Sequence, residues 1–115
     1  MMLKEGDKIL VAQRRLFRGD QARFFVGRVD AYEAGVVKAT GHTFVRDLIT
    51  GNLLEKADGR TKILSLSSGT LIVYQLPEGI FLDSINFVVE DGSLSLRDGQ
   101  GFVMNLTEFS RRSRV

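Results

Sequence analysis

The chain of 115 residues contains no cysteine and no tryptophan, and it has a single proline and a single histidine. Without cysteine it has neither disulfides nor thiolate chemistry. His42 has no second histidine or cysteine with which to complete a metal site or a nucleophile–base pair. We therefore expect no catalytic residue, no metal and no cofactor, and we predict that the protein is not an enzyme.

Long apolar runs and a strong charge of one sign are also missing. No run approaches the roughly 20 apolar residues of a membrane-spanning helix, and the stretch from Met1 to Asp7 turns polar too early for a signal peptide. We expect no membrane association and a cytoplasmic location. The formal net charge is +2, a weak signal for nucleic acid. The length suits one domain, residues 1–115.

The chain also lacks any sustained helical periodicity and instead carries β-prone runs. The run from Ile9 to Phe17 and the run that resumes at Ala22 predict a hairpin. Alternation from Phe25 to Ala31 is typical of a half-buried strand. The run from Val37 to Val45 predicts another strand, whose small residues favour strong bending. We expect residues 47–59 to form a surface loop or an extended hairpin tip.

A sharp reversal is predicted at Ser67-Ser68-Gly69-Thr70, where the glycine can adopt a positive φ. The β-prone runs 60–66 and 71–76 flank it, and Pro77 ends the second run because proline cannot donate to a strand ladder. Such a pair of strands is typical of small barrels that pair edge to edge with neighbouring copies.

After Pro77 the pattern predicts a separate three-stranded meander. Its strands are expected at 85–89, 94–96 and 102–106, with Asp-Gly turns at Asp91-Gly92 and Asp98-Gly99. The chain is therefore predicted to be all-β. We expect the meander over residues 78–109, followed by a basic tail at 110–115.

Two segments resemble the motifs of the Sm and Sm-like protein family. Phe25-Val26-Gly27-Arg28-Val29, followed by Asp30 and the strand to Val37, is similar to the first motif; Leu66 to Tyr74, with Gly69, is similar to the second. The resemblance covers residues 8–77. It implies a small, strongly bent five-stranded Sm-like or SH3-like barrel. It also implies a homo-oligomeric ring, in which the fourth strand of one copy pairs with the fifth of the next.

The resemblance assigns the ring interface to the two strands around Gly69, at residues Leu64, Leu66, Leu71, Val73 and Gln75. The family's RNA-reading positions are not matched. Gly35 stands nearest to the position of an asparagine, and Ser68 stands where the family has a basic residue. These departures weaken the prediction of RNA binding while leaving that of a barrel and ring.

Cations around the first hairpin are candidates for holding phosphate groups. We assign a nucleic-acid site to Arg14, Arg15, Arg18 and Lys38, with base stacking by Tyr32. The alternatives are scattered surface charge and, for Tyr32 as for Phe24 and Tyr74, packing in the core or between subunits. In a ring, symmetry repeats each cation and strengthens the field.

Two functions follow from these observations. The first is an Sm-like ring that binds single-stranded RNA or another polyanion. The second is a structural or scaffold oligomer, which binds other proteins through the meander and takes no nucleic acid. The missing RNA-reading residues favour the second function, and the family resemblance favours the first.

Overall fold

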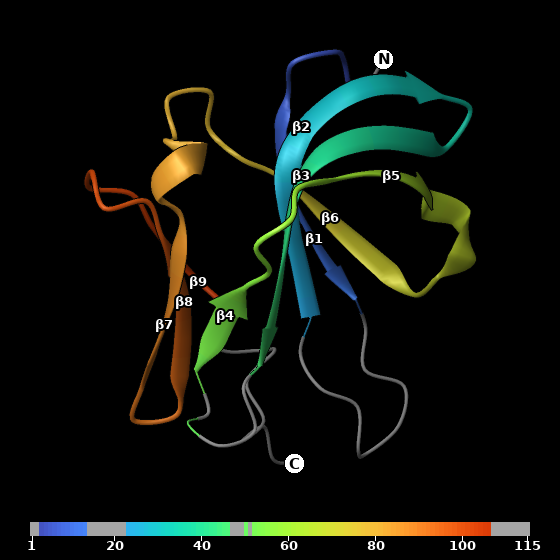
Figure 1. Cartoon of the computed structure of the whole chain (residues 1–115). Coiled ribbons are helices and arrows are strands. Elements are labelled where there is room, and N and C mark those ends of the chain that lie inside the picture. Colours follow the sequence, from blue (N-terminus) through green and yellow to red (C-terminus); the bar gives the residue numbers. More distant parts are fainter. Residues whose placement is uncertain (1–2, 14–22, 47–49, 51, 107–115) are drawn as a thin grey trace.

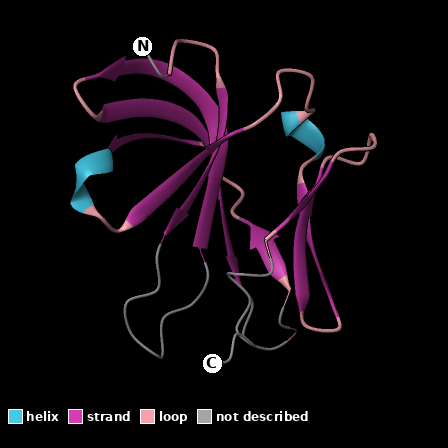
Figure 2. Ribbon diagram, turned by 180° about the vertical axis from the view of Figure 1, so that it is seen from behind, coloured by secondary structure: helices cyan, strands magenta, loops and turns pink. Residues whose placement is uncertain are grey.

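The computed structural model describes residues 3–13, 23–46, 50 and 52–106. Within them the protein is all-β and built from two antiparallel sheets, as predicted. The first sheet contains β1 (Lys8–Gln13), β2 (Arg23–Glu33), β3 (Val36–Arg46), β4 (Leu53–Glu55), β5 (Arg60–Ser65) and β6 (Leu71–Gln75). The second contains β7 (Asn86–Glu90), β8 (Ser93–Arg97) and β9 (Val103–Asn105). Figures 1 and 2 both show the second sheet beside the first.

The first sheet is ordered β4-β3-β2-β1-β6. Strand β5 also pairs with β3, along the first half of β3, whereas β4 pairs with its last residues. The predicted pairing of β1 with β2 is confirmed, with Ile9 opposite Gly27. The last strand, β6, returns to β1, where Val73 lies opposite Val11. The segment at 47–59, predicted as a surface loop or an extended hairpin tip, contains β4, which pairs antiparallel with β3. Leu53 buries its side chain in the core and lies opposite Arg46.

Strands β2 and β3 bend strongly (Figure 1), and two glycines lie opposite each other in this part of their ladder. A Cβ on Gly27 would overlap the carbonyl of Thr40, and one on Gly41 would overlap that of Val26. A bulge between Val29 and Ala31 shifts the register further along, and bulges bend strands. The bend predicted from small residues is therefore present and depends on close backbone approach.

The reversal at Ser67 to Thr70 is confirmed in a different form. A short 3₁₀ segment, η1 (Leu66–Ser68), ends at Gly69 with a φ of 80°. The flanking strands do not pair with each other: β5 pairs with β3 and β6 with β1. The turn therefore connects β5, which pairs with β3, to β6, which pairs with β1 on the other side of the sheet.

The predicted meander is confirmed, with the order β7-β8-β9. Asp91 and Gly92 both have positive φ, 49° and 82°, which is the geometry of a type I′ hairpin turn. A second 3₁₀ segment, η2 (Leu82–Ser84), lies in the connection from β6 to β7 (Figure 2). No helix in the described part of the chain combines the length and the apolar character needed to span a bilayer.

Two apolar clusters stabilise this arrangement. The inter-sheet cluster lies between the sheets, and Phe24 stacks on Phe87 there with ring centroids 4.9 Å apart. The inner cluster lies on the other face of the first sheet and includes Ile9, Val11 and Phe25. Strands β1 and β2 are thus buried on both faces. The prediction that β2 buries only one face is therefore wrong, because the second sheet covers the other face.

Candidate functional site

A pocket of about 300 Å³ lies where β2 and β5 begin, and its lining is mainly cationic. Its lining contains four basic side chains and one carboxylate, with one threonine and one alanine completing it: Arg23, Lys56, Arg60, Lys62, Asp58, Thr43 and Ala57. We call this the basic pocket. Arg23 begins β2, Arg60 and Lys62 belong to β5, and residues 56–58 connect β4 to β5.

Strand geometry explains why these cations meet. Arg60 and Lys62 are two residues apart in β5 and therefore share one face, the face on which Leu64 packs against the inner cluster. Arg23 shares a face of β2 with Phe25 for the same reason. Because β2 and β5 both pair with β3, the three cations lie at the polar end of the inner face.

Lys62 is the most embedded cation of the basic pocket. Its side chain is half-buried, and its Nζ lies 5.0 Å from the centroid of the Phe25 ring, a distance typical of a cation–π contact. Burial, and then repulsion from Arg23 and Arg60, lowers the pKa of Lys62. The pocket therefore concentrates positive charge around Lys62.

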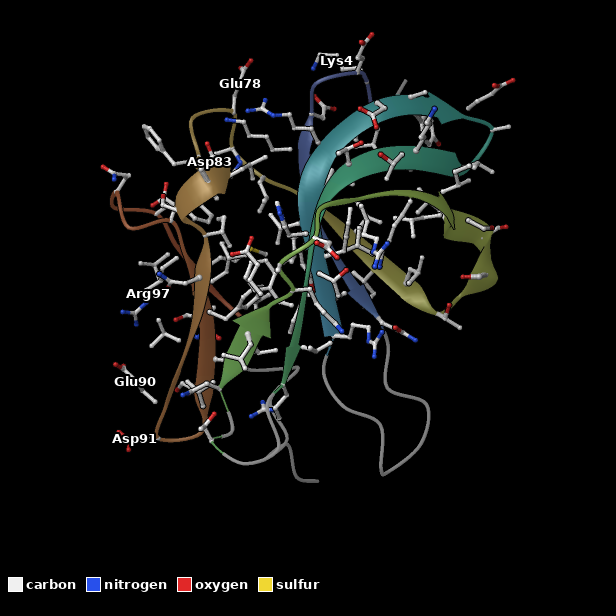
Figure 3. The ribbon with its side chains drawn as sticks, viewed as in Figure 1. Lys4, Glu78, Asp83, Glu90, Asp91 and Arg97 are labelled. Atoms are coloured by element: carbon white, nitrogen blue, oxygen red, sulfur yellow. The ribbon has the colours of Figure 1, made fainter. Side chains whose placement is uncertain are left out.

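The ion pairs among the described residues lie elsewhere. They join Lys4 to Asp7, His42 to Glu55 and Arg97 to Glu90. Arg97 and Glu90 project from the outer side of the second sheet (Figure 3). The four cations of the basic pocket make no ion pair with any described carboxylate, Asp58 included. Such a cluster attracts anions.

The residues predicted to bind nucleic acid are not brought together at this pocket. Arg14, Arg15 and Arg18 lie outside the described residues. Tyr32 lies near the β2–β3 turn, about 30 Å of strand beyond Arg23 at the usual rise per residue. Lys38 lies on β3 opposite Ile63 of β5, so its side chain is on the other strand face from that of Lys62. Lys38 is exposed, whereas Tyr32 is half-buried against the inner cluster.

The aromatic residues considered for base stacking are otherwise used for packing. Phe24 is 1% exposed, and Tyr74 packs against the inter-sheet cluster. His42 faces Glu55, with Nδ1 3.5 Å from Oε2. Within the described ranges, no group of three or more histidine, aspartate or glutamate side chains is placed to hold a metal ion.

The residues predicted for the oligomer interface lie at two strand edges that pair with no other described strand. Leu64 and Leu66 belong to β5 and η1, while Leu71, Val73 and Gln75 belong to β6. The four apolar side chains pack, half-buried, against the inner cluster. Gln75 is exposed and donates from Nε2 to Asp7 Oδ2.

Backbone hydrogen bonds show which groups these edges present. Leu66 donates to Gly35 and Leu76 donates to Lys8, so alternation along antiparallel ladders directs the next N–H groups outward. The outward residues are Thr61, Ile63 and Ser65 in β5 and Leu71, Val73 and Gln75 in β6. Each edge therefore offers three residues for a further strand.

Sequence reasoning missed the basic pocket because its members are scattered from position 23 to 62. The one local signal was the alternation Arg60-Thr61-Lys62, which places two cations on one strand face. A scan against family models and searches of curated proteins and of solved structures found no match to this chain.

Proposed function

We propose that this protein is an Sm-like ring that binds single-stranded RNA or another polyanion in its basic pocket. The observation that carries the proposal is the convergence of Arg23, Lys56, Arg60 and Lys62 on one pocket, where none of them forms an ion pair with a carboxylate that the structure describes. Phosphate groups would neutralise these cations and release counterions, which favours binding.

The strand arrangement supports an Sm-like barrel. The first sheet bends strongly, and its last strand returns to pair with its first. A short 3₁₀ turn with a left-handed Gly69 separates the final two strands. An inner cluster formed by residues of β1, β2, β3, β5 and β6 is consistent with a sheet that curls around its own core.

The two open edges support assembly into a ring. Ile63 on β5 is 72% exposed, and β6 contains neither proline nor a charged residue. Natural sheets usually protect such edges. Pairing of β5 with β6 of a second copy is head-to-tail, and a head-to-tail contact closes into a ring when its rotation permits.

Assembly and ligand binding are coupled in this proposal. Arg60 and Lys62 belong to the strand whose outer edge would pair with the neighbour. Each copy would therefore place one basic pocket close to a subunit boundary. Repetition around the symmetry axis would convert separate pockets into an electropositive ring for a flexible strand.

Salt-dependent binding of a fluorescent single-stranded RNA tests the ligand. The double variant Arg60→Gln/Lys62→Gln should bind at least tenfold more weakly. The slope of log affinity against log salt concentration should become shallower by about 1.4 if two phosphate contacts are lost. Lys4→Gln/Arg97→Gln removes the same charge from two ion pairs outside the basic pocket. Equal weakening in both double variants would contradict a defined site.

A scaffold oligomer is the second candidate. It is favoured by Gly35 and Ser68 at the two positions where the resembling family reads RNA, and by Val103 on β9, which is 59% exposed on the meander. An oligomer that shows no salt-dependent RNA binding would favour this function over the first.

A further inference from the structure

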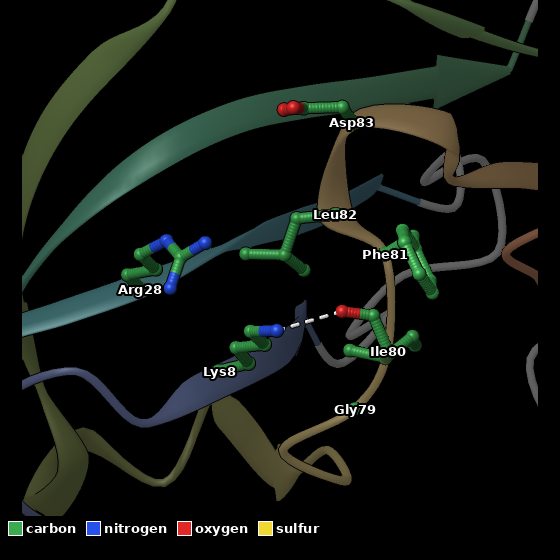
Figure 4. A pocket seen from close by; sticks show the side chains of 7 residues that line it. All are labelled: Lys8, Arg28, Gly79, Ile80, Phe81, Leu82 and Asp83. Carbon is green, nitrogen blue, oxygen red and sulfur yellow. Dashed lines mark hydrogen bonds between the residues drawn. The ribbon is translucent and has the colours of Figure 1, made fainter.

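A second pocket, of about 210 Å³, lies on the opposite face of β2 from the basic pocket. Its lining comes from β1, β2 and the segment that connects the two sheets: Lys8, Arg28, Gly79, Ile80, Phe81, Leu82 and Asp83 (Figure 4). Arg28 shares its face with Phe24 and Val26, whereas Arg23 shares the other with Phe25. The two pockets are therefore independent.

The pocket holds charges of both signs that do not neutralise each other. Arg28 makes no hydrogen bond or ion pair with any described residue, and neither does Asp83. In Figure 4 the Arg28 guanidinium lies to the left of Leu82 and the Asp83 carboxylate lies above it. A ligand between them would meet a cation at one end and an anion at the other.

Lys8 adds a second cation and fixes the connecting segment. It lies directly opposite Arg28 in the β1–β2 ladder, an arrangement of like charges that costs stability. Its Nζ donates to the carbonyls of Glu78 and Ile80, at 2.7 Å each, which leaves one of its three N–H donors. A carboxylate beside Arg28 would relieve the repulsion between the two cations.

An apolar surface completes the pocket. Leu82 is half-buried and packs against the inter-sheet cluster, whereas Ile80 belongs to that cluster and is 2% exposed. The accessible part of Leu82 offers an apolar surface for a hydrocarbon group beside the two charged ends. A ligand that matches this lining carries a carboxylate, an ammonium group and an apolar side chain.

We propose that this pocket binds a free apolar α-amino acid. Arg28 pairs with the carboxylate through two parallel hydrogen bonds, a geometry that guanidinium and carboxylate groups favour. Asp83 accepts hydrogen bonds from the ammonium group. The side chain of the amino acid rests on Leu82.

Amide chemical shifts recorded during titration test the proposal with three probes. L-Leucine should shift the amides of residues 79–83. Leucinamide, which lacks the carboxylate, and N-acetyl-leucine, which lacks the ammonium group, should each bind at least tenfold more weakly. Absence of shifts at these residues with L-leucine, or equal affinity for all three probes, would overturn the proposal.

Two exposed variants assign the contacts. Arg28→Gln should weaken leucine binding at least tenfold and should no longer distinguish leucine from leucinamide. Asp83→Asn should no longer distinguish leucine from N-acetyl-leucine. Arg97→Gln, on the second sheet, is the control and should bind as wild type. Unchanged discrimination in both pocket variants would contradict the assignment. RNA binding at the basic pocket is a separate measurement, so either proposal can fail alone.

Discussion

The ammonium of Lys62 lies 5.0 Å from the centroid of the Phe25 ring. This contact joins the basic pocket to the inner cluster, because Phe25 is one of the buried residues of that cluster. A cation at this boundary is partly removed from water and is flanked by Arg23 and Arg60. It therefore favours an anionic ligand at the expense of the stability of the empty protein.

The difference in thermal stability between the wild type and Lys62→Met should depend on pH. Burial, and then Arg23 and Arg60, lower the pKa of Lys62 below its ordinary 10.5. Between the lowered pKa and 10.5 the unfolded chain binds more protons than the folded protein, so the free energy of unfolding rises with pH. We expect the wild type to gain thermal stability relative to Lys62→Met across this window, measured as the difference in Tm.

The control for that measurement is Lys38→Met, which removes an exposed lysine from β3. The difference in Tm from the wild type should change more with pH for Lys62→Met than for Lys38→Met. An equal change in both variants would show that the folded protein does not disfavour the charged form of Lys62.

Asp98 should stabilise the meander through its carboxylate. The side chain is 2% exposed and accepts hydrogen bonds from the backbone N–H groups of Phe81, Gln100 and Phe102. Burial opposes ionisation, but these donors outweigh it and lower the pKa of Asp98 below 3.8. The stabilisation is complete above 3.8 and is lost as pH falls through the lowered pKa.

Asp98→Asn should therefore have a lower Tm than the wild type at neutral pH. The difference between the two Tm values should become smaller in acid. Asp91→Asn is the matched control in the same meander. Asp91 is exposed and has a positive φ, which asparagine tolerates, so its Tm should match the wild type. Equal Tm values for Asp98→Asn and the wild type would contradict this role.

Gly41→Ala should disrupt the bend of β2 and β3. The new Cβ would overlap backbone atoms of Val26 and Gly27, and the backbone offers no flexible group that can move aside. We expect a loss on the order of 3 kcal/mol in the free energy of unfolding, at the upper end for overpacking, measured by denaturant titration. Gly79→Ala meets no atom within 4 Å and should cost far less.

Val73→Pro should separate the subunits of the proposed ring without breaking the subunit itself. The N–H of Val73 points away from β1, so proline removes a donor from the open edge only. We expect the mass in solution, measured by light scattering, to fall to that of the monomer. The control is Val103→Pro, on the edge strand β9, whose N–H also points outward. A native mass for Val73→Pro would exclude this edge as the interface.

Local features were predictable from the sequence. The Asp91-Gly92 turn, the alternation in the meander and the small residues at the bend each act over a few positions, so neighbouring residues suffice to indicate them. The position of Gly69 at the reversal belongs to the same group.

Features that depend on distant partners were not predictable in this way. Burial of both faces of β2 requires the second sheet, which follows it by more than fifty residues. The basic pocket likewise depends on register, since only the pairing of β3 with both β2 and β5 brings Arg23 to Lys62. Periodicity identifies a strand face but not what covers it.

Native mass spectrometry of the protein purified without nuclease, with absorbance at 260 and 280 nm measured on the same sample, tests the central claim most directly. We predict a closed multimer that carries nucleic acid and loses it in Arg60→Gln/Lys62→Gln. A monomer free of nucleic acid would contradict both the ring and its ligand.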